Sequence, residues 1–225
     1  NYIVLINLYS FNPNPVLLLT PVFLYSLVEY LKKGQKIYIV SSWILAGLFF
    51  NFEMNFGVFM PVAIFISIVL TQKIKLLRDR WLWFGILIFA AMLLPQLIFD
   101  LKHQFIMSKA ILRHLSENNG TSFNLLDRFR SVSLSFYNTF IPTLMNQKLL
   151  AWVILILFIP AIYGWLKQKE KVVLVSLVFI FVPFLGYLVL PVTINPWHLG
   201  GEMVASLILI AYLIKKLWES NLISK

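Results

Sequence analysis

Seven apolar segments divide this chain, and they constrain its fold more than any other feature. A transmembrane helix needs roughly 20 mostly apolar residues, and each segment comes near that length. With 60% hydrophobic and 12% charged residues, the chain also has too little polar surface for a soluble globule of 225 residues. The sequence therefore predicts an all-α polytopic membrane bundle with about seven transmembrane helices. Their approximate bounds are 15–31, 37–52, 56–71, 81–99, 149–166, 172–190 and 199–214.

Basic residues recur at every second connection between these segments. Most of the 19 Lys and Arg residues lie in the linkers after the first, third, fifth and seventh segments, whereas linkers 52–55 and 191–198 contain none. The remaining basic residues lie in one long loop, 100–148. Because Lys and Arg collect in cytoplasmic loops, this pattern predicts an outside start and an inside C-terminus. It also accounts for most of the net charge of +10 without any nucleic-acid partner.

The motifs of soluble enzymes are missing from the sequence. The chain has no cysteine, which excludes disulfides, thiolate metal sites and cysteine nucleophiles. It has no glycine-rich phosphate loop, nucleophile elbow, HExxH or dinucleotide fingerprint. The chain begins at Asn1, and its opening NYIVLINLYSF has neither the basic region nor the cleavage site of a signal peptide. We therefore expect residues 1–225 to form a single integral-membrane domain that is part of a longer protein.

Polar and titratable side chains collect on the predicted outer side. Ionisable groups at membrane depth are costly and usually face a water-filled cavity or a partner, so chemistry is expected at this face. The candidate substrate-binding residues are Asn12, Asn14, Glu53, Asp100, Lys102, His103, His198 and Glu202.

The end of the fourth segment, PQLIFDLKHQF, contains the densest group of these candidates. If the helix continues past Phe99, then Gln96, Asp100 and His103 share one face at positions i, i+4 and i+7. A carboxylate and an imidazole on one face can bind a sugar hydroxyl, a phosphate-bound cation or a proton. The alternative is an ordinary helix end that enters solvent.

His198 and Glu202 repeat the i, i+4 spacing where the last segment begins. Together with Asp100 and His103 they form a set of donors that can bind a divalent metal. Spacing across two distant helices is not a metal motif, so no cofactor is assigned.

Other acidic and amide residues have simpler structural explanations. Asn14 can cap the first helix, because a proline follows it at the opening position. Glu29 is followed by Lys32 and Lys33 at i+3 and i+4, which favours a surface ion pair over a proton relay. Glu53 must lie close to the membrane surface because its linker is so short, and both a structural and a functional role stay open.

The long outer loop contains two amphipathic stretches, around 105–115 and 123–140. A loop of this length inside a compact domain is usually functional. Both stretches suit helices that lie in the membrane interface, with Arg and Lys available to a lipid or prenyl-linked phosphate. Plain anchoring to lipid headgroups is the alternative.

Three motifs follow one another in an order found in a known family. They are FNPNPVLL, AGLFFNFEMNFGVFMP and LPQLIFDLKHQFIMSKAIL. This order resembles the middle of bacterial membrane glycosyltransferases of the GT-C superfold, in particular the family 39 group related to dolichyl-phosphate-mannose-protein mannosyltransferases. The second half of the chain matches by hydropathy only. Glu53 and Met54 stand where relatives commonly carry a Gln-x-His pair, which puts a specific acceptor contact there in doubt.

The resemblance implies transfer of a sugar from a polyprenyl-phosphate-linked donor to a lipid, glycan or protein acceptor at the outer face of a bacterial cytoplasmic membrane. In such enzymes a carboxylate in the first outer loop serves as general base, and basic residues hold the lipid phosphate. That loop would precede Asn1, so no catalytic residue is assigned. Asp100, Lys102 and His103 are implied as a wall of the donor or acceptor pocket.

Two other functions use the same substrates. A flippase or transporter would bind lipid-linked sugars without breaking a bond, and a polymerase or ligase would join envelope polysaccharides. Transporters usually carry polar residues near the middle of several helices. This chain has few there, which favours chemistry at one surface.

Overall fold

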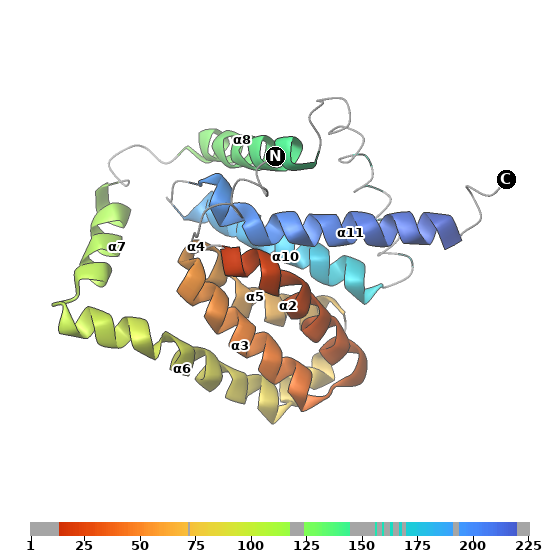
Figure 1. Cartoon of the computed structure of the whole chain (residues 1–225), viewed down its shortest axis with the longest axis horizontal. Coiled ribbons are helices and arrows are strands. Elements are labelled where there is room, and N and C mark those ends of the chain that lie inside the picture. Colours follow the sequence, from red (N-terminus) through yellow and green to blue (C-terminus); the bar gives the residue numbers. More distant parts are fainter. Residues whose placement is uncertain are drawn as a thin grey trace.

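The computed structural model describes residues 14–71, 73–117, 124–144, 170–190 and 194–219, together with positions 156, 159, 163 and 167. Every regular element in these ranges is a helix, which confirms the all-helical prediction for this part of the chain. The elements are α2 (Asn14–Lys33), α3 (Lys36–Phe52), α4 (Met54–Gly57), α5 (Met60–Leu70), η1 (Ile74–Arg78), α6 (Arg80–Lys102), α7 (Ile106–Glu117), α8 (Leu125–Leu144), α10 (Lys171–Val189), η3 (Pro196–Leu199) and α11 (Gly200–Glu219) (Figure 1).

Four of the described helices are long and apolar enough to cross a membrane. They are Pro15–Lys33, Arg80–Lys102, Lys171–Val189 and Pro196–Lys216. The apolar segments Lys36–Phe52 and Met54–Leu70 are shorter. The predicted fifth span, 149–166, falls almost wholly outside the described residues, so the count of seven stays a prediction.

A group of buried aromatic rings joins the helices of the bundle. Phe49 of α3 and Phe56 of α4 lie 5.5 Å apart between ring centroids, and Phe56 lies 5.1 Å from Phe179 of α10. Phe23 of α2 completes the group at 5.2 Å from Phe179. Edge-to-face and tilted pairs at these distances add to the stabilisation from burial. The rings fix α4 against α2 and α10.

Glycines allow the helices to approach one another closely. A Cβ atom on Gly85 of α6 would fall 1.8 Å from the Trp43 ring of α3. A Cβ atom on Gly201 of α11 would fall 2.2 Å from the Phe56 ring. Small residues at such crossings are typical of helix packing inside membranes, where close contact replaces hydrophobic burial as the driving force.

Basic residues from separate connections gather at one end of the bundle, which we call the basic end. Near the end of α2, Glu29 pairs with Lys32 at 3.1 Å and with Lys33 at 2.6 Å, which confirms the predicted ion pair. Lys171, at the start of α10, lies close enough to Lys32 and to Lys73 of the α5–η1 linker to interact electrostatically with both.

The last part of α11 lies at the same end. The Lys216 ammonium is 3.3 Å from a carboxylate oxygen of Glu170, the residue before α10. Residues that follow the first, third, fifth and seventh predicted segments therefore meet at the basic end. The basic connections that alternate in the sequence are thus brought together in the structure.

The helices α6, α7 and α8 lie around this packed body (Figure 1). The side chains of Leu87, Leu97 and Leu101 are more than half exposed on α6. α8 packs on α10 through Phe136, whose ring centroid is 5.0 Å from that of Phe184. Both amphipathic stretches of the long loop are thus helical, and their position in a membrane interface stays a prediction.

Candidate functional site

A cluster of polar side chains lies at the end of the bundle opposite the basic end. We call it the polar cluster, and it consists of Glu53, Asn55, Tyr187, His198 and Glu202. Its first member lies at a corner of the chain: Glu53 has an extended backbone, with φ −147° and ψ 91°, which ends α3 before α4 begins. The corner, the last turn of α10, η3 and the first turn of α11 each contribute a side chain.

His198 is oriented by its own short helix. The Asn195 side chain accepts a hydrogen bond from the backbone of His198, and Nδ1 of His198 accepts one from the backbone N–H of Asn195 at 3.2 Å. Since Nδ1 is an acceptor, Nε2 carries the proton in the neutral imidazole. That Nε2 points into the polar cluster, 3.9 Å from Oε1 of Glu53 and 3.2 Å from the side-chain amide of Asn55.

Glu53 is nearly buried, with about 10% of its side chain exposed. Burial raises the pKa of Glu53 above 4.5, while hydrogen bonds from Asn55 act in the opposite direction. The carboxyl group therefore holds its proton more readily than an ordinary surface glutamate. Beside an imidazole, such a group can accept or donate a proton and can bind a hydroxyl.

Glu202 and Tyr187 form the deepest part of the polar cluster. Tyr187 is fully buried and donates its hydroxyl hydrogen to the backbone oxygen of Asn55 at 3.2 Å. Glu202 is 0% exposed, and within the described part of the chain neither of its carboxyl oxygens has a hydrogen-bond partner. It lies close enough to Glu53 and Tyr187 to interact electrostatically with them.

Asp100 lies at a separate place, between α6 and α7. Its carboxylate accepts hydrogen bonds from the backbone N–H of Met107 at 2.7 Å and from the backbone N–H and the hydroxyl of Ser108. These are the bonds of a helix N-cap, which satisfy amide groups that a helix start leaves unpaired. The buried carboxylate of Asp100 is therefore occupied in holding α7.

His103 is the C-cap residue of α6 and lies close enough to Asp100 to interact electrostatically with it, as the spacing predicted. α6 ends at Lys102, which is exposed, and the chain then turns through positive φ values at Gln104 and Phe105. The exposed His103 folds back on its own helix, where Nδ1 lies 2.7 Å from the carbonyl oxygen of Phe99. A role for these residues in substrate binding stays a prediction.

The other candidate residues lie at the start of the chain and in the polar cluster. Asn12 lies outside the described residues, and Asn14 is the first residue of α2, where the structure does not describe its side chain. The sequence placed Glu53, His198 and Glu202 on one side of the membrane, and the structure brings them together. Tyr187 was not among the candidates. The available signal was a hydroxyl near the outer end of an otherwise apolar segment.

The donor set considered for a divalent metal does not assemble. Asp100 and His103 lie at the α6–α7 turn, whereas His198 and Glu202 belong to the polar cluster. Among the described residues, no group of three or more His, Asp or Glu side chains is arranged to hold a metal ion. The side chains of the polar cluster are suited to proton transfer and hydrogen bonding.

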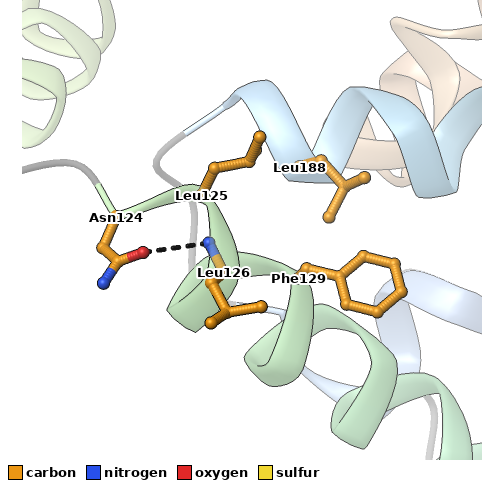
Figure 2. Close-up of a pocket in the computed structure, with 5 residues that line it drawn as sticks. All are labelled: Asn124, Leu125, Leu126, Phe129 and Leu188. Atoms are coloured by element: carbon orange, nitrogen blue, oxygen red, sulfur yellow. Dashed lines mark hydrogen bonds between the residues drawn. The ribbon is translucent and has the colours of Figure 1, made fainter.

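An apolar hollow of about 520 Å³ opens between the start of α8 and the end of α10 (Figure 2). Its only polar lining residue, Asn124, caps α8 by accepting a hydrogen bond from the N–H of Leu126 at 3.0 Å. The hollow and the polar cluster share the last turn of α10, which contributes Leu188 to the hollow and Tyr187 to the cluster. It is lined by Asn124, Leu125, Leu126, Phe129 and Leu188.

Arg128 holds α8 against the end of α10. Its Nε donates to the carbonyl oxygen of Tyr187 at 2.9 Å, and a terminal nitrogen donates to that of Leu190 at 2.6 Å. A guanidinium placed on the last carbonyls of a helix satisfies their free acceptors and also interacts favourably with the helix dipole. Arg128 therefore fixes the start of α8 on the end of α10.

Comparisons of the chain with protein-family models, with curated proteins and with solved structures give no match. The resemblance to the GT-C glycosyltransferases consequently depends on the three sequence motifs alone. The structural features that bear on function are the polar cluster, the hollow and the basic end.

Proposed function

We propose that the protein is a membrane glycosyltransferase that transfers a sugar from a polyprenyl-phosphate-linked donor to a lipid, glycan or protein acceptor. In this proposal about seven spans cross a bacterial cytoplasmic membrane, and the site faces outward. The observation that carries the proposal is the position of the polar cluster, at the end of the bundle opposite the basic end. Since Lys and Arg mark the cytoplasmic side, the polar cluster belongs to the outer surface.

The chemistry of the polar cluster supports a sugar substrate. Carboxyl, amide and imidazole groups are the side chains that hydrogen-bond the hydroxyls of sugars, because they offer both donors and acceptors. Glu53 and His198 retain about 10% and 9% of their side-chain exposure, so they border the surface rather than the protein interior. In this proposal they orient the acceptor or the sugar, and the catalytic base is left unassigned.

The apolar hollow supports a lipid-linked donor. Its leucine and phenylalanine lining suits a prenyl chain, which is a hydrocarbon and gains free energy on leaving water. Leu188 of the hollow and Tyr187 of the polar cluster lie in the same turn of α10, and in this proposal a prenyl chain seated in the hollow presents its phosphate end toward the cluster. Arg130 is exposed on the same helix and offers a cation for that phosphate.

Sugar transfer in nanodiscs tests this proposal. The protein is supplied with a radiolabelled polyprenyl-phosphate sugar and acceptor lipids, and labelled product is counted for wild type, Glu53→Gln and His198→Gln. Loss of one hydrogen bond to a charged group lowers transfer by about tenfold or more. Glu219→Gln, on the exposed part of α11, is the matched control and keeps wild-type transfer. Undiminished transfer in both cluster variants, with the fold retained, would reject the site.

The lipid part of the proposal has a separate test. Phe129→Ser places a polar group in the hollow and should raise KM for a long-chain prenyl donor while leaving KM for a short-chain analogue unchanged. An equal effect on both donors would show that the hollow does not hold the prenyl chain.

A transporter of lipid-linked sugars is the second candidate, and Glu202 is the observation that favours it. A fully buried acid in a candidate membrane span is a typical feature of ion-coupled transport. Reconstituted vesicles distinguish the two functions. A transporter moves the intact lipid-linked sugar to the other leaflet, whereas a transferase leaves the prenyl phosphate without its sugar.

A further inference from the structure

Glu202 lies inside the bundle because two glycines come before it. A Cβ atom on Gly200 would fall 2.9 Å from Cδ2 of Leu17, and one on Gly201 would fall 2.2 Å from the Phe56 ring. With hydrogen in place of side chains, the first turn of α11 settles between α2 and α4. This placement carries the Glu202 carboxyl group away from water, to 0% exposure.

Among the described residues, the charged side chain that acts on Glu202 is another acid, Glu53. The corner between α3 and α4 contributes Glu53, α10 contributes Tyr187, and η3 contributes His198 one turn before Glu202. α2 has no titratable side chain between Pro15 and Leu24. On α8, Arg128 donates to backbone carbonyl oxygens at the end of α10.

An ionised Glu202 is therefore strongly disfavoured in this position. A buried carboxylate needs hydrogen bonds or an opposite charge, and within the described residues neither of its oxygens has a hydrogen-bond partner. The neighbouring carboxyl of Glu53 adds repulsion when both groups are ionised. Binding of a positive charge to the carboxyl group removes this cost.

The geometry favours a proton over a metal ion as that charge. A metal ion needs several ligands around one point, and the described residues contain no such group of three His, Asp or Glu side chains. A proton needs only the carboxyl group itself. Glu53 also offers a path for exchange, because it interacts electrostatically with Glu202, keeps some contact with solvent and lies 3.9 Å from Nε2 of His198, a gap that one water molecule can bridge.

We propose that Glu202 is a proton-binding site at the polar end of the bundle, loaded from the surface through Glu53 and His198. Binding adds one proton from water to a carboxylate oxygen and neutralises the group, with no other bond formed or broken. The site does not depend on which substrate the protein handles, so it stands or falls separately from the glycosyltransferase proposal.

Infrared spectroscopy of the full-length protein in lipid nanodiscs tests the proposal directly. A protonated carboxylic acid shows a carbonyl stretching band that an ionised carboxylate lacks. At neutral pH the wild type should show this band, and Glu202→Gln should lose it completely. Glu219→Gln, a change of the same kind on the exposed end of the same helix, should keep it.

A second variant guards against misfolding. Glu202→Asp retains the acid in a different position, so the band should move in frequency and remain at neutral pH. Transfer of the wild type into deuterated water should shift the band, and the shift should be slower in His198→Phe than in wild type. Equal rates would remove His198 from the path.

Three results would overturn the proposal. One is an absent band in the wild type at neutral pH. A second is a band that disappears in Glu53→Gln and persists in Glu202→Gln, since the proton would then reside on Glu53. A third is a band that is lost on adding sodium ions at constant pH, which would identify a cation site.

Discussion

Gly201→Ala tests how closely α11 is packed on α4. The new Cβ atom would lie 2.2 Å from Cζ of Phe56 and 2.7 Å from both Cε atoms. An ordinary carbon–carbon contact is about 3.5–4.0 Å, so helix and ring must separate by about 1 Å or more. The ring has no free space to move into, since Phe49 and Phe179 pack on it. Overpacking of this kind costs about 1–3 kcal/mol.

A smaller effect acts in the opposite direction. Alanine favours helix formation over glycine by about 1 kcal/mol at most. Because a contact of 2.2 Å falls at the upper end of the overpacking range, the net loss is about 2 kcal/mol. For a chain of this size that corresponds to a fall in melting temperature of roughly 4–8 °C. Thermal unfolding of the detergent-solubilised protein, followed by circular dichroism, measures it.

The double variant Gly201→Ala with Phe56→Leu shows whether the contact itself is responsible. Leucine removes ring atoms that the new Cβ would strike, so the double variant should be less destabilised than the sum of the two single variants. Additive effects, or a Gly201→Ala protein as stable as wild type, would refute the argument that α11 is seated on this ring.

Other residues give predictions of the same kind. Asp100→Ala should uncap α7 at a cost of about 0.5–2 kcal/mol, seen as faster amide hydrogen exchange in Ile106–Glu117, and unchanged exchange would contradict the capping role. Because burial raises the pKa of Glu53, its folded form holds a proton to higher pH than its unfolded form. The stability of the wild type should therefore decrease as pH rises above 4.5 through the raised pKa. In Glu53→Gln the melting temperature should depend less on pH over this range. Arg128→Leu should lower the free energy of local opening of α8 by about 1–2 kcal/mol, measured by amide hydrogen exchange in α8. Arg130→Leu, on the exposed side of the same helix, should leave it unchanged.

Hydropathy and charge predicted the parts of the fold that depend on local sequence. The helices α2, α3, α6, α10 and α11 begin and end close to the predicted segments, because long apolar runs bounded by charged residues leave few alternatives. The ion pairs of Glu29 follow from helical spacing alone. The basic connections lie at one end of the bundle because successive helices run in opposite directions, so every second connection falls on the same side.

Features that depend on contacts between distant residues could not be predicted. The i, i+4 spacing places His198 and Glu202 on one face, but it does not say that this face is buried against α2 and α4. Asp100 caps α7 across a turn with positive φ at Gln104 and Phe105, residues that do not signal such a turn. The interaction of His103 with Asp100 follows from their short spacing, whereas the hydrogen bonds that Asp100 accepts from α7 do not.

Thiol labelling tests the central claim, that the basic end and the polar cluster face opposite sides of the membrane. The chain has no cysteine, so a single introduced thiol has no background. Lys75→Cys reports on η1 at the basic end and Lys109→Cys on α7, and both side chains are exposed. In sealed right-side-out vesicles a membrane-impermeant maleimide should label Lys109→Cys directly and Lys75→Cys only after the vesicles are opened. Labelling of both positions from the same side would contradict the account.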